Sequence, residues 1–343
     1  MTQKVLAPQD RYQLLGKELL LKVHSLMVGA RVLEERLIKM SKSGDGFFWI
    51  GGPGEEAFNV SLGLQVKKGQ GPLHDYLHLH YRSSAILLAM GASPIDSIRQ
   101  MRSVETDPYS KGRNFVNHCA IPDWNVVPMS PTIETQYSTV IGTAIAQARL
   151  KTDAISIVNG GDGGTAEGDF HSCLVWANRP ALPLPVLIIV VNNGYAISVP
   201  EPTQHGESQI SNWGRVFDMP SKTINGNDPI ESYFAIQEAM AYCRKERRPY
   251  ILEAKTSRLN GHSSSSGANR VAEIDCITVF EKELLSRKLM SQDEIDKVWD
   301  TCLREIDAAH QKVKTESFPK PESIWDDVFA EGLPDSYPTK GGS

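Results

Sequence analysis

The stretch NGGDGGTAEGDF at residues 159–170 decides how the chain folds, and it combines glycine with acidic residues. Glycine-rich loops commonly bind phosphate through exposed backbone N–H groups. Carboxylates repel phosphate, yet this loop holds Asp162, Glu167 and Asp169. The loop therefore predicts an anion site in which a cation stands between a carboxylate and the anion.

The segments on either side of this loop predict a parallel β-sheet. Residues 154–158 (AISIV) form a continuous apolar run, as expected for a strand buried on both faces. Residues 165–178 predict a helix, and residues 186–191 (VLIIVV) predict the next strand. Ligands of such strand–loop–helix–strand units bind beyond the carboxyl ends of the strands. We therefore predict an α/β fold with a central, mostly parallel sheet flanked by helices.

Other segments fit the same architecture. Residues 10–40 predict an N-terminal helix, because their apolar positions recur every three or four residues. Residues 250–257 (YILEAKTS) predict a further strand, and residues 260–269 form a polar loop rich in glycine and serine. Ser291 and Glu294 have the spacing of a capping box, which predicts the start of a C-terminal helix.

Composition sets the broad class of the protein. The 343 residues predict a single domain, with an N-terminal helical segment at 1–45, an α/β core at 46–290, and a C-terminal helix and tail at 291–343. A net charge of −5 argues against nucleic acid as a partner. The longest apolar run is too short to span a bilayer. The five scattered cysteines are typical of reduced thiols, which predicts a cytoplasmic location.

Asp162 is the carboxylate placed to meet a cation. Glu167 and Asp169 fall in the first turn of the predicted helix, where negative charge complements the helix dipole. Asp162 lies in the loop itself, and NNGYAIS at residues 192–198 brings the amide oxygen of Asn193 to the end of the next strand. Mg²⁺ takes about six oxygen ligands and often bridges carboxylate to phosphate. The pattern predicts Mg²⁺ bound by Asp162, Asn193 and a backbone carbonyl.

The loop has three other possible interpretations. A dinucleotide fold requires G-x-G-x-x-G, whereas the glycines here follow G-x-G-G-x-x-x-G. A nucleoside-triphosphate loop requires G-K-[ST], and no lysine follows these glycines. The glycines could also serve a ligand-free turn, which the loop alone leaves open.

The spacing of GDG at residues 161–163 and NN at residues 192–193 is that of thiamine-diphosphate enzymes. Along essentially its whole length, the chain resembles the alpha subunit of the thiamine-dependent first component (E1) of 2-oxo acid dehydrogenase complexes. The motifs that carry the resemblance are RVLEER (31–36), GPGEEA (52–57), HYRS (80–83), KGRN (111–114), GGDGGTAEGD (160–169), NNGYAIS (192–198), GHSSSS (261–266) and IWDDVF (324–329).

This resemblance implies thiamine diphosphate and Mg²⁺ as cofactors. Asp162, Asn193 and the carbonyl oxygen of Tyr195 would hold Mg²⁺. The other residues that the resemblance places against the cofactor are Tyr81, Arg82, Ile133, Gly161, Gly163, Gly164, Thr165 and His262. Arg82 suits a phosphate because its planar guanidinium donates two parallel hydrogen bonds. His262, in the serine-rich loop, is the expected catalytic residue that reaches the diphosphate.

The substrate is expected to be a 2-oxo acid. GFFWIGGPGEE at residues 46–56 resembles the branched-chain subfamily more than the pyruvate subfamily. Phe48 and Trp49 are candidates for the acyl pocket, with plain core packing as the alternative. The resemblance favours 2-oxoisovalerate over pyruvate, with acetoin as a third possibility.

The resemblance also implies partner chains. In the family, the glutamate that activates the cofactor comes from a beta subunit in an α2β2 heterotetramer, and the acyl group passes to a lipoylated acyltransferase component. Val191 stands where several branched-chain relatives have an arginine, which leaves a cofactor-incompetent regulatory or assembly paralogue as an alternative. The presence of Asp162, Asn193, Arg82 and His262 weighs against that alternative.

Overall fold

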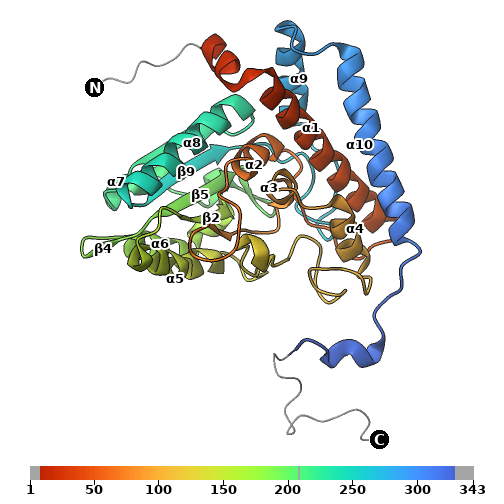
Figure 1. Ribbon diagram of the computed structural model, residues 1–343, viewed down its shortest axis with the longest axis horizontal. Coiled ribbons are helices and arrows are strands. Elements are labelled where there is room, and N and C mark those ends of the chain that lie inside the picture. The colour runs from red at the N-terminus through yellow and green to blue at the C-terminus, as the bar shows by residue number, and fades with distance from the viewer. Residues whose placement is uncertain (1–7, 208, 329–343) are drawn as a thin grey trace, which may run out of the picture.

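The computed structural model describes residues 8–207 and 209–328 (Figure 1). Within them, the main sheet has five strands in the order β1-β2-β5-β9-β8, and each neighbouring pair is parallel. The strands are β1 (Tyr76–His78), β2 (Ser156–Gly161), β5 (Val186–Asn192), β9 (Tyr250–Lys255) and β8 (Ser221–Asn225). The predicted α/β fold with a central parallel sheet is confirmed.

Helices cover both faces of this sheet, which explains the continuous apolar run in β5. Figure 1 shows α5 (Thr135–Leu150) and α6 (Gly168–Ala177) on one side of the strands. The other side is covered by α2 (Glu56–Gly63), α3 (Ser84–Ala89) and α8 (Pro229–Glu246). Alternate residues of a strand point to opposite faces, so Ile188 packs under α5 and α6 while Leu187 and Ile189 pack under the opposite helices.

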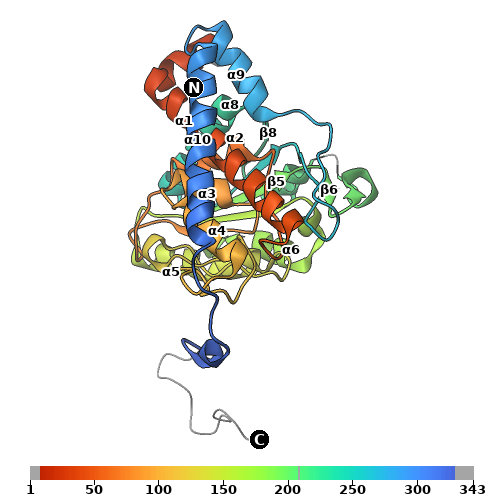
Figure 2. The same ribbon diagram turned by 90° about the vertical axis from the view of Figure 1, so that its right-hand side faces the viewer.

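A further helical layer lies outside α2 and α3. It consists of α1 (Pro8–Ser43), α4 (Pro94–Arg102), α9 (Cys276–Ser286) and α10 (Gln292–Val313). Figures 1 and 2 both show α10 running along α1. The predicted capping box is confirmed, because Ser291 accepts from the Glu294 amide while the Glu294 carboxylate accepts from the Ser291 amide.

The predicted elements differ from the structure mainly at their ends. The helix predicted at 10–40 is α1, which extends to Ser43 and bends at Gly16, where φ is 75°. The strand predicted at 154–158 begins two residues later and runs into Gly161. The helix predicted from residue 165 begins only at Gly168, because Glu167 is extended and residues Gly163–Ala166 form a separate 3₁₀ turn.

Shorter elements complete the described chain. They are the strands β3 (Asn178–Arg179), β4 (Leu182–Pro183), β6 (Tyr195–Ala196) and β7 (Val199–Pro200), the helix α7 (Trp213–Val216), and 3₁₀ turns at Pro122–Trp124, Glu201–Thr203, Ile210–Asn212 and Pro321–Trp325. No described helix is long and apolar enough to cross a membrane. The end of the IWDDVF motif and the rest of the predicted tail, residues 329–343, lie outside the described residues.

The sheet core should dominate stability. Ile188→Ala removes a fully buried side chain from the central strand, so we expect a loss of about 2–5 kcal/mol in the free energy of unfolding. The matched control is Ile274→Ala, because Ile274 is 62% exposed and its truncation should change the free energy by less than about 0.5 kcal/mol. Urea denaturation measures both, and equal losses would contradict this description of the core.

Candidate functional site

Two polar side chains converge where the neighbouring strands β2 and β5 end. Asp162 directly follows β2 and Asn193 directly follows β5, and the register pairs Gly161 with Val191. Both side chains are buried, with exposed fractions of 1% and 5%. The Asn193 backbone N–H donates to Asp162 Oδ1 at 3.2 Å. The structure thus brings the two predicted metal ligands into direct contact.

Three buried oxygen atoms at this point have no hydrogen-bond donor. They are Asp162 Oδ2, Asn193 Oδ1 and Glu55 Oε2. Burying an acceptor without a partner costs free energy, and a bound cation would remove that cost. Glu55 also orients the amide, because its Oε1 accepts from Asn193 Nδ2 at 3.1 Å and leaves Asn193 Oδ1 free. The donor set fits a hard cation such as Mg²⁺.

Acidic residues alone do not build this site. Among the described residues, no group of three or more His, Cys, Asp or Glu side chains is arranged to hold a metal ion. The predicted set instead combines the Asp162 carboxylate with the Asn193 amide oxygen and the carbonyl of Tyr195, which lies in β6 beside the same cavity. Glu55 was missed as a site residue, although its motif GPGEEA was recognised.

A cavity of about 460 Å³ opens at these strand ends. Most of the predicted cofactor-binding residues line it: Tyr81, Arg82, Ile133, Gly161, Asp162, Gly163, Gly164, Asn193, Tyr195 and His262. Thr165 is the exception, because its hydroxyl is turned under the loop and donates to the Asp162 carbonyl at 2.7 Å. Thr165 therefore supports the loop from behind. Gly163 and Gly164 lie in a 3₁₀ turn, and the helix that follows begins only at Gly168.

Buried Arg82 and half-buried His262 form a pair on one wall of the cavity. Arg82 Nη2 lies 3.0 Å from His262 Nδ1, and the guanidinium lies 5.3 Å from the centre of the Tyr81 ring. Burial lowers the pKa of His262 to about 4, and the charges of Arg82 and Arg258 act in the same direction. His262 is therefore neutral near pH 7. Because arginine can only donate, Nδ1 accepts and Nε2 carries the proton.

The two predicted acyl-pocket residues lie apart. Trp49 is fully buried, and its indole N–H donates to Glu34 Oε2 at 2.8 Å. It therefore packs in the core, outside the cavity, as the alternative interpretation held. Phe48 is half-buried, and its ring lies 5.3 Å from that of Phe115, which is exposed. These two rings leave Phe48 as the remaining candidate for contact with a substrate.

Two basic residues that the motifs did not reveal also support the site. Arg258 stacks over the Tyr195 ring at 4.6 Å and donates to the Ile197 carbonyl at 2.7 Å, which holds the β6 segment. His205 Nε2 lies 3.0 Å from the Asp162 carbonyl oxygen. The sequence contained no spacing that would have singled out these residues, because both contacts are made between segments distant along the chain.

Glu134 is the least expected side chain in the cavity. It is 5% exposed, has a left-handed backbone (φ 67°), and directs Oε1 toward the Gly161 amide at 3.4 Å. A β-carbon on Gly160 or Gly164 would lie 2.2 or 1.9 Å from its carboxyl oxygens, so both glycines make room for it. Burial raises the pKa of the Glu134 carboxyl to about 8, and the charge of Asp162 adds to the effect.

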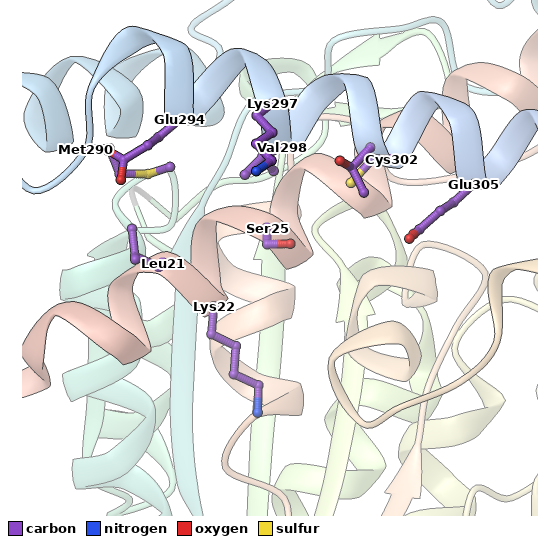
Figure 3. Close-up of a pocket in the computed structure, with 10 residues that line it drawn as sticks. Leu21, Lys22, Ser25, Met290, Glu294, Lys297, Val298, Cys302 and Glu305 are labelled. Atoms are coloured by element: carbon purple, nitrogen blue, oxygen red, sulfur yellow. The ribbon is translucent and has the colours of Figure 1, made fainter.

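A second groove, of about 560 Å³, lies between α1 and α10 (Figure 3). Its lining comes from two sides: Leu21, Lys22 and Ser25 belong to α1, and Glu294, Lys297, Val298, Cys302 and Glu305 belong to α10. This groove contains no strand end, glycine loop or unsatisfied buried acceptor. Its size alone therefore does not make it a catalytic site.

Comparison with known proteins identifies the family. The family model for the dehydrogenase E1 component matches residues 24–322. The chain belongs to the dehydrogenase E1 component family. This assignment confirms the family resemblance, the fold class and the enzyme class that the motifs predicted, and with them a dependence on thiamine diphosphate.

Individual E1 relatives cover most of the chain. The 2-oxoisovalerate dehydrogenase subunit alpha of Bacillus subtilis is 30% identical over 334 residues, which are 94% of this chain and 99% of the relative. The mitochondrial subunit alpha 2 of Arabidopsis thaliana is 31% identical over 265 residues, 77% of this chain and 54% of the relative. The human mitochondrial subunit alpha is 26% identical over 327 residues, 92% of this chain and 72% of the relative.

The raised pKa of Glu134 predicts a pH-dependent stability. In the unfolded chain this carboxyl has a pKa of about 4.3, so between about pH 5 and 8 the folded state binds one more proton than the unfolded state. Its contribution to stability is present below that range and falls by about 1.4 kcal/mol per pH unit as the pH rises toward 8.

The test compares the wild type with Glu134→Gln, in which the side chain at position 134 is uncharged at every pH. Urea denaturation of the cofactor-free chain should show wild-type stability falling relative to Glu134→Gln between pH 5 and 8. Parallel stability curves for the two proteins would show that the Glu134 carboxyl is ionised in the fold.

Proposed function

We propose that this E1 chain is the alpha subunit of a branched-chain 2-oxo acid dehydrogenase that uses thiamine diphosphate and Mg²⁺. The observation that carries the metal assignment is the set of buried, unsatisfied oxygens of Asp162, Asn193 and Glu55 at the ends of two adjacent strands. The names of the relatives support the substrate class, since each of the three compared is a 2-oxoisovalerate dehydrogenase alpha subunit.

The residues present divide the binding of such a cofactor among them. Asp162, Asn193 and the Tyr195 carbonyl would hold Mg²⁺, while the neutral His262 would donate its Nε2 proton to a phosphate oxygen. Arg82 would contribute a fixed positive charge on the same wall. Bound thiamine diphosphate supplies the nucleophilic carbon that attacks a 2-oxo acid and the electron sink for loss of carbon dioxide.

A beta subunit completes the proposed enzyme. Activation of the cofactor requires a carboxylate against its pyrimidine, held where water is scarce. Of the carboxyls that line this cavity, Asp162 is the proposed metal ligand, Glu134 is turned toward the glycine loop, and Glu167 is exposed to solvent. We therefore propose that a partner chain supplies the carboxylate in an α2β2 assembly, and that a lipoylated acyltransferase accepts the acyl group. The five free cysteines support a cytoplasmic location.

The acyl chain of the substrate is proposed to contact Phe48. This ring and Phe115 stand next to each other, and Phe115 in turn meets the edge of His118, which stacks on Tyr81 in the cavity wall. The aromatic path therefore leads from the cavity toward Phe48. One methylene in an apolar pocket is worth about 1–3 kcal/mol, so pyruvate should be a poorer substrate without being excluded.

The metal assignment predicts that cofactor and Mg²⁺ bind together. Asp162→Ala and Asn193→Ala should each weaken thiamine diphosphate binding in the presence of Mg²⁺ by more than about a hundredfold, because each removes a ligand oxygen. Calorimetry measures the affinity. Asp218→Ala is the matched control, since the Asp218 side chain is 99% exposed and does not line the cavity. Wild-type affinity in either ligand variant, or undiminished affinity in chelator, would refute the assignment.

The partner assignment predicts that the chain alone has no oxidative decarboxylation activity. Reconstitution with a beta subunit should restore it, with kcat/KM for 2-oxoisovalerate at least about tenfold above that for pyruvate, whose acyl chain is two carbon atoms shorter. The assay follows carbon dioxide release with an artificial electron acceptor. Turnover by the purified single chain would overturn the partner model, whereas a preference for pyruvate would overturn only the substrate assignment.

A further inference from the structure

We infer that Glu34, a buried residue of α1, is a positioning residue that fixes the relative positions of the Arg82 and His262 side chains. The inference rests on the proposed function only where it concerns cofactor binding, since its structural part concerns the chain alone. Glu34 lies outside the cavity and does not contact Arg82 or His262 directly. It acts through two separate chain segments, one leading to each member of the pair.

Glu34 is an unusual group to find in a core. It is 2% exposed, and no Lys, Arg or His of the described residues lies within ion-pair distance of it. Its oxygens instead accept from Trp49 Nε1 at 2.8 Å, Ser84 Oγ at 2.6 Å and Asn117 Nδ2 at 3.4 Å. A buried carboxylate without a cation is costly, so a role in fixing these donors accounts better for its presence than packing does.

The first segment leads from Glu34 to His262. The indole of Trp49 is held by Glu34, and the Trp49 backbone is in turn bonded to the serine-rich loop. Trp49 N–H donates to Ser264 Oγ at 3.1 Å, and the Ser264 N–H donates back to the Trp49 carbonyl at 2.8 Å. Ile50 and Ser263 form an antiparallel bridge beside them. The loop is thus tied to the Trp49 segment one and two residues after His262.

The second segment leads from Glu34 to Arg82. Ser84, which donates to Glu34, is the first residue of α3 and follows Arg82 by two positions. The Gly51 carbonyl accepts from Arg82 Nη1, and the Gly51 backbone lies so close to Glu34 that a β-carbon there would be 2.1 Å from Glu34 Oε2. Glu34 therefore accepts a hydrogen bond from the chain next to Arg82 and lies against the backbone of Gly51, whose carbonyl accepts from the Arg82 guanidinium.

Together these contacts explain how a polar loop holds a fixed position. The loop has four consecutive serines after His262 and buries little apolar surface, so hydrogen bonds must define its place. Arg82 Nη2 and His262 Nδ1 are 3.0 Å apart. Each of the two residues is connected to the Glu34 carboxylate through one of the two segments. Removing the carboxylate should loosen the pair even though the fold is retained.

The experiment measures hydrogen exchange of the full-length, cofactor-free chain. Glu34→Met keeps the volume but removes both acceptor oxygens, and Glu34→Gln keeps one oxygen for the Trp49 indole. Ser264→Ala breaks only the segment to the loop and, being half-buried, leaves the fold secure. Leu284→Ala, in α9, is the control that lowers global stability without touching either segment.

We expect the backbone amide at position 264 to exchange at least about tenfold faster in Glu34→Met and Ser264→Ala than in the wild type. Its exchange rate in Glu34→Gln should lie between those of the wild type and these two variants. Leu284→Ala should lower the urea midpoint while leaving that amide unchanged. The proposal is overturned if the Ser264 amide is unprotected in the wild type, or if Glu34→Met and Ser264→Ala exchange at the wild-type rate. It is also overturned if Leu284→Ala accelerates the amide as much as Glu34→Met does.

Calorimetry then links the loop to the cofactor. With thiamine diphosphate and Mg²⁺ as the probe, Glu34→Met and Ser264→Ala should each raise the Kd about tenfold, and Leu284→Ala should not. An unchanged Kd in both variants would overturn the link to the pair. If the wild type itself binds no thiamine diphosphate, the proposed function fails, and the exchange data still decide the role of Glu34.

Discussion

The structure depends on one constraint: two neighbouring parallel strands end side by side and leave buried oxygen atoms that no protein donor satisfies. Asp162 and Asn193 lie together because β2 and β5 are hydrogen-bonded neighbours, and Asp162 Oδ2 and Asn193 Oδ1 have no donor among the described residues. A cation is the simplest group that satisfies several oxygens at one point. The glycine loop and the cavity lie at the point where these oxygen atoms require a cation.

Another wall of the cavity presents hydrogen-bond donors, whereas the strand ends present acceptors. On this wall, Arg82 is a positively charged donor and His262 is a neutral donor. The distance between the two side chains is fixed by hydrogen bonds that lead back to Glu34 in α1. The sheet therefore positions the metal ligands, while the chain before α3 and the serine-rich loop supply the groups suited to an anion. An anion that carries its own metal ion would bridge the two walls, which is the arrangement expected of a Mg²⁺ diphosphate.

Much of this could be predicted from the sequence, because the decisive signals are local. The apolar run of β5 and the glycine loop after β2 predicted the sheet. The order of the motifs indicated the family. The start of α6 could not be placed, since it depends on the extended backbone of Glu167. Trp49, Glu134 and Arg258 were misjudged or missed because burial and partner choice arise from segments that meet only in the folded chain.

A crystal structure of the chain with thiamine diphosphate and Mg²⁺ would locate the ion. We expect it about 2.1 Å from Asp162 Oδ2, Asn193 Oδ1 and the Tyr195 carbonyl oxygen, with two diphosphate oxygens and a water completing the octahedron. An ion bound elsewhere in the cavity, or a diphosphate held there with no metal against Asp162 and Asn193, would contradict this expectation.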